Sequence, residues 1–521
     1  SRWQAGGSGE TLRGWLVGLE REGLRVAGNG KIAQTPHPAG LGSALMHPAI
    51  TTDYSEALLE LITPPSSRRG SLLECLQNLQ TFVQGQLGQE LIWASSMPCI
   101  LDSPEHIPIA HYGLSNRGLM KTVYRRGLGH RYGRVMQVIA GIHFNFSLPD
   151  DFWPIFQAME GNTQGSRDFI SASYLGMMRN LQRLGWLIPY LFGASPAVCK
   201  TFLQGRATDL LPFDEGTYHH PYATSLRMGR IGYQNRLEEG VGIKACYDNL
   251  ENYIASLARA IETPYPPYQA IGVVVNGGYE QLNANILQIE NEYYSTVRPK
   301  QPPEGLEKPS LALARRGIRY IELRSLDVNP FEPLGVAEET LCFLEAFLIF
   351  CLLADSPRIG PEERQAIDLN QTLAAHQGRE PALELAYVNG RVGLRDWGLG
   401  ILDAMVPLCA YLDGWESADK PHQRVLAEMR ARLKEPERTP SARVLAMMQS
   451  HDESYFEMTR RLSEQHRQFF KAQRLDPALE ASFAQEAQTS MARQAALEAS
   501  DTQPFSEFLA DYFAQGRGGG S

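Results

Sequence analysis

Apolar and polar side chains alternate along several short runs in the first two-thirds of the chain. This period of two is typical of strands that bury one face of a sheet and leave the other face polar. The alternation predicts strands at residues 18–26, 57–63, 141–148, 270–275, 282–290 and 318–326. Helical periodicity predicts helices at residues 70–87, 171–191 and 248–263. We therefore expect an α+β structure in which helices cover one face of a sheet.

The pattern changes to a mostly helical one after about residue 337, with charged segments at residues 423–434 and 453–474. We expect an α+β part at residues 1–335, a mainly helical part packed on it at residues 336–515, and a flexible tail at residues 516–521. Four prolines predict a loop at residues 298–310. The most apolar run, residues 346–354, is too short for a membrane span of roughly 20 residues and predicts a buried helix.

Composition narrows the class of protein. The 521 residues carry a formal net charge of −9. Nucleic acid is therefore not an expected partner, because phosphate binding usually needs a basic surplus. The seven cysteines include no CxxC pair, which argues against a zinc site or a disulfide framework and fits a reducing cytoplasm. The start of the chain lacks the basic-then-apolar pattern of a signal peptide, so we expect a cytoplasmic protein.

Carboxylates recur on the polar faces of the predicted strands. Side chains two residues apart on a strand share a face. The resulting faces are those of Glu20 and Glu22, of Glu60 alone among aliphatic residues, of His143 and Asn145, and of Tyr320, Glu322 and Arg324. Two carboxylates on one face repel each other unless a cation lies between them.

These faces favour a site for Mg²⁺ or Mn²⁺ together with a phosphate. Carboxylates without cysteine suit a hard divalent cation, and arginine among them suits a phosphate. The chemistry that this combination indicates is phosphoryl transfer. The alternative is that each strand merely has a solvated face, which is the commoner meaning of a single such pattern. The chain has no GxxxxGK[ST], GxSxG or HExxH motif, so a P-loop site is not supported.

The acidic strands also resemble a known family. The resemblance lies in GLEREGLRV at 18–26, ITTDYSEALLE at 50–60, SMPC at 96–99, YRRGL at 124–128, GIHFNFSLP at 141–149, PYLFGASP at 189–196, YATSLRM at 222–228, LQIENE at 287–292, YIELRSLD at 320–327 and DTQPF at 501–505. In this order they are similar to the large single-chain bacterial glutamate–cysteine ligase (γ-glutamylcysteine synthetase). The match spans nearly the whole chain, which makes it more specific than any one motif.

The resemblance implies a reaction and a fold. ATP would phosphorylate the γ-carboxylate of L-glutamate, and the amine of L-cysteine would attack the γ-glutamyl phosphate to give γ-glutamylcysteine, the first intermediate of glutathione synthesis. The fold would be like that of glutamine synthetase, with a curved antiparallel sheet forming a cup and helices outside. The expected partners are these small molecules alone, with a monomeric chain and no membrane.

The resemblance also assigns residues. The acids that hold Mg²⁺ in the family match Glu20, Glu22, Asp53, Glu60 and Glu322, and a histidine at that cluster matches His143. Arg125 and Arg324 match arginines that face the transferred phosphate. The residues that match the cysteine pocket are Tyr54, Tyr124, Arg227, Tyr233 and Tyr294, and Gln137 and Asn145 are candidates for the nucleotide.

Each assignment has a structural alternative. The acids and arginines can form ordinary ion pairs, His143 can be a hydrogen-bonded histidine beside the sheet, and the tyrosines and Arg227 can simply pack. The chain also departs from the family at Tyr54, where phenylalanine is typical, and at Gly23, where threonine is common. Tyr54 therefore leaves the size of the cysteine pocket open.

Alternatives to the cysteine ligase are a glutamate ligase of the same fold that uses another amine, and a catalytically silent regulatory relative. The silent relative is disfavoured because all the expected acids are present. A loop should cover the acyl phosphate, and residues 204–217 and 297–310 are the candidates. A second ATP-binding domain, which a bifunctional enzyme would need, is not expected within 521 residues.

Overall fold

The centre of the molecule is an antiparallel sheet. The computed structural model describes residues 12, 14–232, 244–388, 390–414 and 419–516. The strands follow the order β11-β12-β5-β1-β3-β2, and β4 pairs with the far end of β1. Their bounds are β1 (Leu16–Val26), β2 (Ile50–Thr52), β3 (Leu58–Ile62), β4 (Leu91–Ile92), β5 (Ile142–Ser147), β11 (Val297–Lys300) and β12 (Tyr320–Leu326). The four predicted strands at 18–26, 57–63, 141–148 and 318–326 are confirmed.

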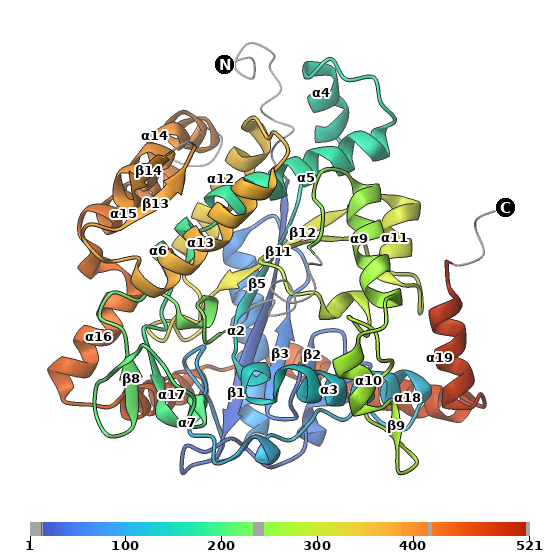
Figure 1. Ribbon diagram of the computed structural model, residues 1–521. Helices are drawn as coiled ribbons and strands as arrows, with labels where there is room; N and C mark the ends of the chain where they lie inside the picture. Colours follow the sequence, from blue (N-terminus) through green and yellow to red (C-terminus); the bar gives the residue numbers. More distant parts are fainter. Residues whose placement is uncertain (1–11, 13, 233–243, 389, 415–418, 517–521) are drawn as a thin grey trace.

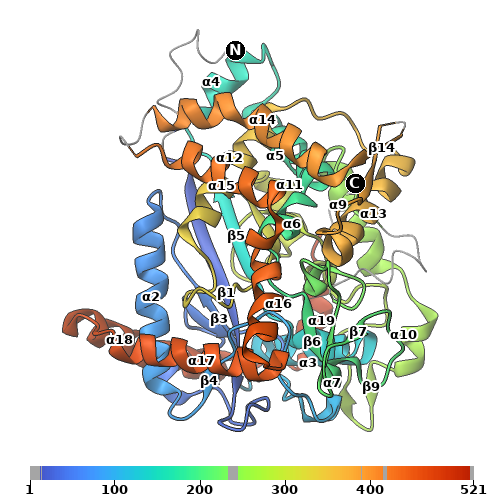
Figure 2. The same ribbon diagram turned by 90° about the vertical axis from the view of Figure 1, so that its left-hand side faces the viewer.

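Helices cover the apolar face of this sheet (Figures 1 and 2). The side chains of Ile142, Phe144 and Phe146 on β5 are fully buried, as the alternation predicts. Helix α2 (Arg69–Gln86) packs on β1 and β3, and α5 (Ser166–Leu184) packs on β11. Helix α12 (Glu338–Leu353), which contains most of the apolar run, is buried along most of its length between neighbouring helices. No helix in the described part of the chain is long and apolar enough to cross a membrane.

The helical C-terminal part also agrees with the sequence pattern. Segments 423–434 and 453–474 are α15 (Pro421–Lys434) and α17 (Tyr455–Ala472), and a capping box at Ser454 fixes the start of α17. The other elements here are α13 (Pro361–Gln377), β13 (Glu384–Tyr387), β14 (Gly390–Gly393), α14 (Leu394–Asp413), α16 (Pro440–His451), α18 (Pro477–Ser500) and α19 (Phe505–Ala514). Of the predicted tail, residues 517–521 lie outside the described residues.

Two predicted strands are wrong. Residues 270–275 include the end of a helix, α10 (Pro266–Ile271), which begins at proline, and then β9 (Val274–Val275), which pairs with β10 (Gly278–Tyr279). Residues 282–290 form a loop, because side chains of the segment satisfy its backbone. The amide of Leu282 donates to Gln288 Oε1 at 3.0 Å, and Asn283 Nδ2 donates to the Gln288 carbonyl at 2.8 Å.

Two further boundaries differ from the prediction. The predicted helix 171–191 is two helices, α5 and α6 (Leu187–Phe192), separated at Gly185. The predicted loop 298–310 begins in β11 and ends in α11 (Pro309–Arg316). Pro299 is compatible with β11 because this strand lies at the edge of the sheet.

Further helices and strands lie around the central sheet. The predicted helix 248–263 is confirmed as α9 (Leu250–Glu262), and the predicted helix 70–87 is confirmed as α2. The others are α3 (Asn116–Tyr132), α4 (Phe152–Met159), β6 (Ala197–Cys199), α7 (Lys200–Leu203), β7 (Leu211–Pro212) and β8 (Thr217–His219). Helix α19 packs against α3, so the C-terminal end of the chain supports an element of the first part.

Steric contacts explain why position 23 is a glycine. Arg21 and Gly23 share the face of β1 opposite to the acids, and Arg21 is only 3% exposed. A Cβ atom on Gly23 would lie 2.1 Å from Arg21 Nη1 and 2.8 Å from Ile92 Cγ2. The Arg21 side chain therefore fills the space that a threonine would need, and burial lowers its pKa to about 10. This supports a structural role for Arg21.

Candidate active site

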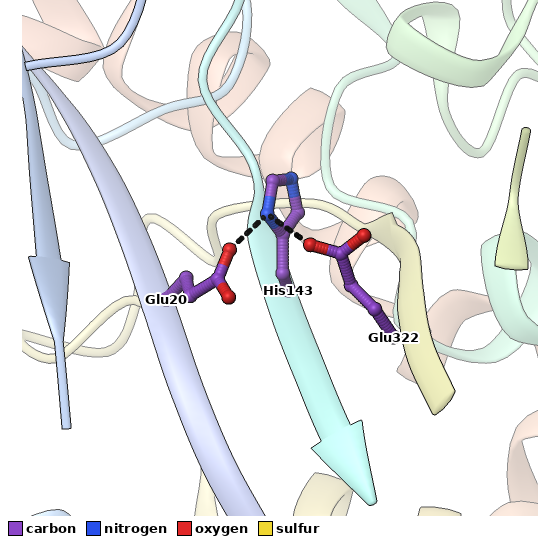
Figure 3. A group of neighbouring side chains, drawn as sticks. All are labelled: Glu20, His143 and Glu322. Atoms are coloured by element: carbon purple, nitrogen blue, oxygen red, sulfur yellow. Dashed lines mark hydrogen bonds and ion pairs between the residues drawn. The ribbon is translucent and has the colours of Figure 1, made fainter. Parts of the chain in front are cut away.

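Three side chains from three neighbouring strands converge at the centre of the polar face (Figure 3). Glu20 on β1 lies directly opposite His143 on β5. Glu20 Oε2 is 2.9 Å and Glu322 Oε1 on β12 is 3.7 Å from His143 Nδ1. One ligand atom from each of the three residues lies within 4.8 Å of the others, which is a spacing that a metal ion can bridge.

A second pair of carboxylates extends the cluster toward β3. Glu22 and Glu60 are direct partners in the register of β1 and β3, and Glu22 Oε1 lies 3.6 Å from His143 Nε2. Burial raises the pKa of Glu22. Burial, together with the charges of Glu20, Asp53 and Glu22, raises the pKa of Glu60 well above its usual range. These acids therefore repel one another and would be stabilised as carboxylates by an added cation.

The opposite end of the cluster is basic. Lys300 Nζ lies 3.2 Å and Arg324 Nη1 lies 3.1 Å from Glu322 Oε1, and Arg298 is the register partner of Glu322. Burial acts to raise the pKa of Glu322, but Lys300, Arg324, His143 and Arg298 hold it well below the usual range. Lys300 and Arg298 were missed from the sequence. The alternation in residues 297–300 places both on one face, but the prolines of that segment predicted a loop.

The donor set fits a hard divalent cation. Within the described residues, Glu322 Oε2 and Asn145 Oδ1 are buried without a hydrogen-bond partner. Asn145 donates from Nδ2 to Glu20 Oε1 at 2.9 Å, so its amide oxygen lies beside the acids. Buried polar atoms rarely remain without a partner. Carboxylate and amide oxygens are ligands that Mg²⁺ and Mn²⁺ prefer, whereas an isolated cluster of acids would remain repulsive.

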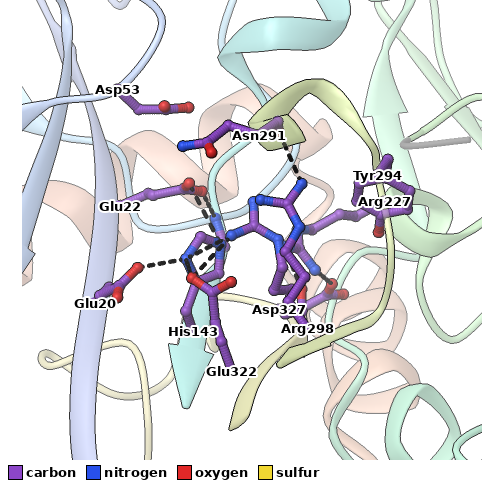
Figure 4. A network of polar contacts seen from close by, with 12 residues as sticks. Glu20, Glu22, Asp53, His143, Arg227, Asn291, Tyr294, Arg298, Glu322 and Asp327 are labelled. Atoms are coloured by element: carbon purple, nitrogen blue, oxygen red, sulfur yellow. Dashed lines mark hydrogen bonds and ion pairs between the residues drawn. The ribbon is translucent and has the colours of Figure 1, made fainter. Parts of the chain in front are cut away.

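Arg227 lies beside the acids and is tightly packed (Figure 4). Its Nη2 donates to the Arg324 carbonyl at 2.9 Å, and its Nη1 is 3.9 Å from Asp327 Oδ1. A Cβ atom on Gly141 would lie 2.0 Å from Nη2, so the guanidinium needs a glycine there. Burial raises the pKa of Tyr294, against the opposing effect of Arg227 and Arg324. The structure thus brings Arg227 and Tyr294 close together, and their place in the cysteine pocket stays a prediction.

Asp327 was given no role by sequence reasoning, although it belongs to the YIELRSLD segment. It is buried and accepts hydrogen bonds from the Ala194 amide at 2.9 Å, Ser195 Oγ at 2.6 Å and Ser225 Oγ at 2.8 Å. These bonds fix the carboxylate that faces Arg227. The sequence did carry a signal for Asp327, because this acid directly follows the strand predicted at residues 318–326.

Helix α3 brings Arg125 to Asp53 at the other side of the cluster. Arg125 Nε donates to the Asp53 carbonyl, Nη2 lies 3.9 Å from Asp53 Oδ1, and the guanidinium stacks over Tyr112 at 4.6 Å. Tyr124, also on α3, packs against an apolar cluster that includes Phe508 of α19. Tyr124 therefore packs against other side chains, as the structural alternative expected. Its place in the cysteine pocket stays a prediction.

Tyr54 points its hydroxyl toward α3. The side chain is buried, and a Cβ atom on Gly129 would lie 2.5 Å from the Tyr54 hydroxyl oxygen. In the described residues this hydroxyl has no hydrogen-bond partner, and burial raises its pKa. The additional hydroxyl, relative to the phenylalanine of the family, thus occupies space beside Gly129.

The remaining predicted site residues lie in different parts of the structure. Asn145 belongs to the acid cluster. Gln137 lies in the short helix Val135–Val138 before β5 and forms no side-chain hydrogen bond within the described part. Tyr233 lies outside the described residues. Of the two candidate covering loops, 204–217 contains β7 and residues 297–300 are β11, so a cover stays a prediction.

The chain is similar to known proteins over nearly its whole length. Residues 3–374 match the family model for glutamate–cysteine ligase. Glutamate–cysteine ligases of Alcanivorax borkumensis and Pseudomonas paraeruginosa are 45% and 47% identical to the chain, each over 96% of it and over 96% and 94% of their own length. The crystal structure of glutamate–cysteine ligase from Francisella tularensis in complex with AMP has a TM-score of 0.90 and 34% identity, covering 97% of this chain and 98% of that one.

We expect the Tyr54 hydroxyl to be a net cost to folding. Tyr54→Phe removes a buried hydroxyl without a partner and should raise the free energy of unfolding by up to about 1 kcal/mol. Urea denaturation measures this change. The KM for cysteine should stay within about twofold, because the hydroxyl faces α3.

Tyr112→Phe is the matched control. The Tyr112 hydroxyl donates to the Thr52 carbonyl at 2.7 Å, so its removal should lower the free energy of unfolding by about 1 kcal/mol. Equal destabilisation of the two variants would contradict the proposed difference between the hydroxyls.

Proposed function

Because the chain belongs to the glutamate–cysteine ligase family, which joins the amine of L-cysteine to the γ-carboxylate of L-glutamate, we propose that ATP and Mg²⁺ drive this ligation on the acid-bearing face of the sheet. The observation that carries the proposal is the meeting of Glu20, His143 and Glu322, with a buried Glu322 oxygen that has no hydrogen-bond partner among the described residues. The AMP bound to the Francisella relative supports a nucleotide co-substrate.

Activation of glutamate needs two anions to approach. An oxygen of the γ-carboxylate attacks the γ-phosphorus of ATP, ADP leaves, and a γ-glutamyl phosphate is formed. Bound Mg²⁺ would neutralise charge between these groups. We assign its binding to Glu20, Glu22, Asp53, Glu60, Glu322 and His143. Five of the six lie on strands of one sheet, and together they would hold both reactants in a fixed position.

The basic end of the cluster suits the transferred phosphoryl group. Arg324 and Lys300 lie beside Glu322 and would face the phosphate oxygens, where charge develops during transfer. Arg125, held by Asp53, would approach from α3. Preorganised cations of this kind need no rearrangement during the reaction.

The second step uses the amine of cysteine. The amine attacks the acyl carbon, loses a proton, and phosphate leaves with the electrons of the C–O bond. Arg227 suits a substrate carboxylate by bidentate bonding, and Tyr294, Tyr124, Tyr54 and Tyr233 complete the proposed pocket. Gln137 and Asn145 remain the proposed nucleotide contacts. No protein nucleophile takes part.

A comparison of amine substrates tests whether cysteine is the amine that the protein uses. The purified protein is given ATP, Mg²⁺ and L-glutamate with L-cysteine, L-serine, L-alanine, glycine or no amine, and phosphate release is measured. We expect the highest kcat/KM with cysteine and γ-glutamylcysteine as the product. Phosphate release no faster with cysteine than with the other amines would favour a ligase for a different amine.

Glu322→Gln should abolish ATP turnover while the fold is retained. The change keeps the size of the side chain but removes the charge that faces Lys300, Arg324 and the proposed metal. A loss of about 10²–10³-fold in kcat is expected from the value of one preorganised electrostatic contact. Circular dichroism checks the fold, and Glu480→Gln on the exposed start of α18 is the control. Turnover within threefold of the wild type would contradict the assignment.

Metal binding should release a proton. The raised pKa of Glu60 means that this carboxyl holds a proton to a higher pH than usual, and Mg²⁺ requires the carboxylate. The affinity for Mg²⁺ should therefore rise with pH up to the Glu60 pKa, by at most about tenfold per pH unit for one proton. Calorimetry in two buffers of different ionisation enthalpy measures the released proton.

Glu60→Gln mimics the protonated acid and should weaken Mg²⁺ binding while reducing the proton release. Glu480→Gln again serves as the control. Proton release that is equal in Glu60→Gln and the wild type would show that Glu60 is not its source.

A further inference from the structure

A cavity lies away from the acid cluster, among α6, α15, α16 and the segment that follows β12. Figures 1 and 2 show these three helices grouped on one side of the sheet. The cavity, here called the rear pocket, has a volume of about 390 Å³. Its charged lining consists of Asp327, whose carboxylate is held by the hydrogen bonds described above, and of Glu332, Glu339, Glu428, Arg424, Arg432 and Arg443. The volume lies within the range of about 300–1,000 Å³ that is typical of small-molecule sites.

One charged pair in the rear pocket is already satisfied by the protein. Arg432 Nε lies 3.4 Å from Glu428 Oε1, and Arg432 Nη1 donates to the Leu191 carbonyl at 3.0 Å. Glu428 also pairs with Arg438 at 2.6 Å. This part of the lining has a structural function and leaves little capacity for a ligand.

The other four charged groups lack an ion-pair partner among the described residues: Glu339, Arg424 and Arg443 are exposed to solvent, and Glu332 is half-buried. Arg443 stacks over the ring of Phe331 at 4.1 Å, which orients its guanidinium without neutralising it. Burial and the nearby Glu339 raise the pKa of Glu332, whereas Arg443 and Arg432 oppose this shift. Two acids and a fixed arginine therefore lie within electrostatic reach of one another around the same space.

Arg21 adds positive charge behind the wall of the rear pocket at Gly335. Gly335 lines the cavity, and the Nε atom of Arg21 is 3.6 Å from where a Cβ atom of Gly335 would lie. Arg21 is almost fully buried, and its Nε has no hydrogen-bond partner in the described residues. A buried guanidinium without a counter-charge increases the attraction for an anion nearby.

We propose that the rear pocket binds a small zwitterion, an amino acid or short peptide with a free α-carboxylate and a free α-ammonium group. The carboxylate pairs with Arg443 and Arg424, for which a planar carboxylate is a suitable bidentate partner. The ammonium pairs with Glu332 and Glu339. A simple anion would leave the two glutamates unpaired, and a simple cation would leave the arginines unpaired.

The rear pocket and the active site share one residue. Asp327 lines the rear pocket and also lies 3.9 Å from Arg227. A ligand in the rear pocket would therefore lie next to the residue whose carboxylate faces the proposed cysteine-binding arginine.

The test compares three probes by calorimetry on the intact protein without ATP. L-Alanyl-L-alanine carries both charges, N-acetyl-L-alanine lacks the ammonium group, and L-alaninamide lacks the carboxylate. We expect the dipeptide to bind at least tenfold more tightly than either of the others. Equal binding of N-acetyl-L-alanine, or no binding of the dipeptide, would overturn the proposal.

Variants assign the binding to the rear pocket. Glu332→Gln combined with Arg443→Gln should weaken dipeptide binding at least tenfold and leave kcat for ligation within twofold, which also shows that the variant is folded. Arg474→Gln combined with Glu480→Gln, a charge-matched change at exposed positions, should bind like the wild type. Undiminished binding in the first double variant would place the dipeptide elsewhere and overturn the proposal.

Discussion

The repulsion among carboxylates on one face of the sheet is the constraint on which the site depends. At an effective dielectric of about 20, two like charges about 4 Å apart repel each other by about 4 kcal/mol. Glu22 and Glu60 are direct cross-strand partners, and Glu20 and Glu322 both approach His143. Such a cluster can persist only if some acids are protonated or if cations lie among them.

The repulsion among the carboxylates is reduced in different ways at the two ends of the cluster. At the β12 end, Lys300 and Arg324 neutralise Glu322, whose pKa is lowered. At the β3 end, no lysine or arginine among the described residues forms an ion pair with Glu22 or Glu60, and the pKa values of these two acids are raised instead. The need for an external cation is therefore greatest at Glu22 and Glu60, whereas the protein itself supplies positive charge where a phosphoryl group would lie. In the proposed reaction, this asymmetry would place the transferred phosphoryl group at the β12 end of the face.

The sequence predicts the part of this site that follows strand alternation. Glu20 and Glu22, His143 and Asn145, and Glu322 and Arg324 lie as the period of two requires, because one face of each strand is buried. Arg298 and Lys300 were not found, because prolines in an edge strand look like a loop. The false strand at 282–290 arose because side-chain hydrogen bonds from Asn283 and Gln288 replace backbone pairing, which periodicity does not register. The boundary at residue 335 and a cytoplasmic location stay predictions.

The sequence patterns did not predict contacts between segments that are distant along the chain. Arg227 is positioned by a carboxylate that directly follows β12, by the Arg324 carbonyl, and by the absence of a side chain at Gly141. None of these partners is near Arg227 in the sequence, and none has a periodic signature. Because Asp327 is fixed by the Ser195 and Ser225 hydroxyls, a shift of the segment that follows β12 would move the carboxylate and the guanidinium together. The same segment forms the wall of the rear pocket, so the position of Arg227 depends on a region of the fold that lies outside the acid cluster.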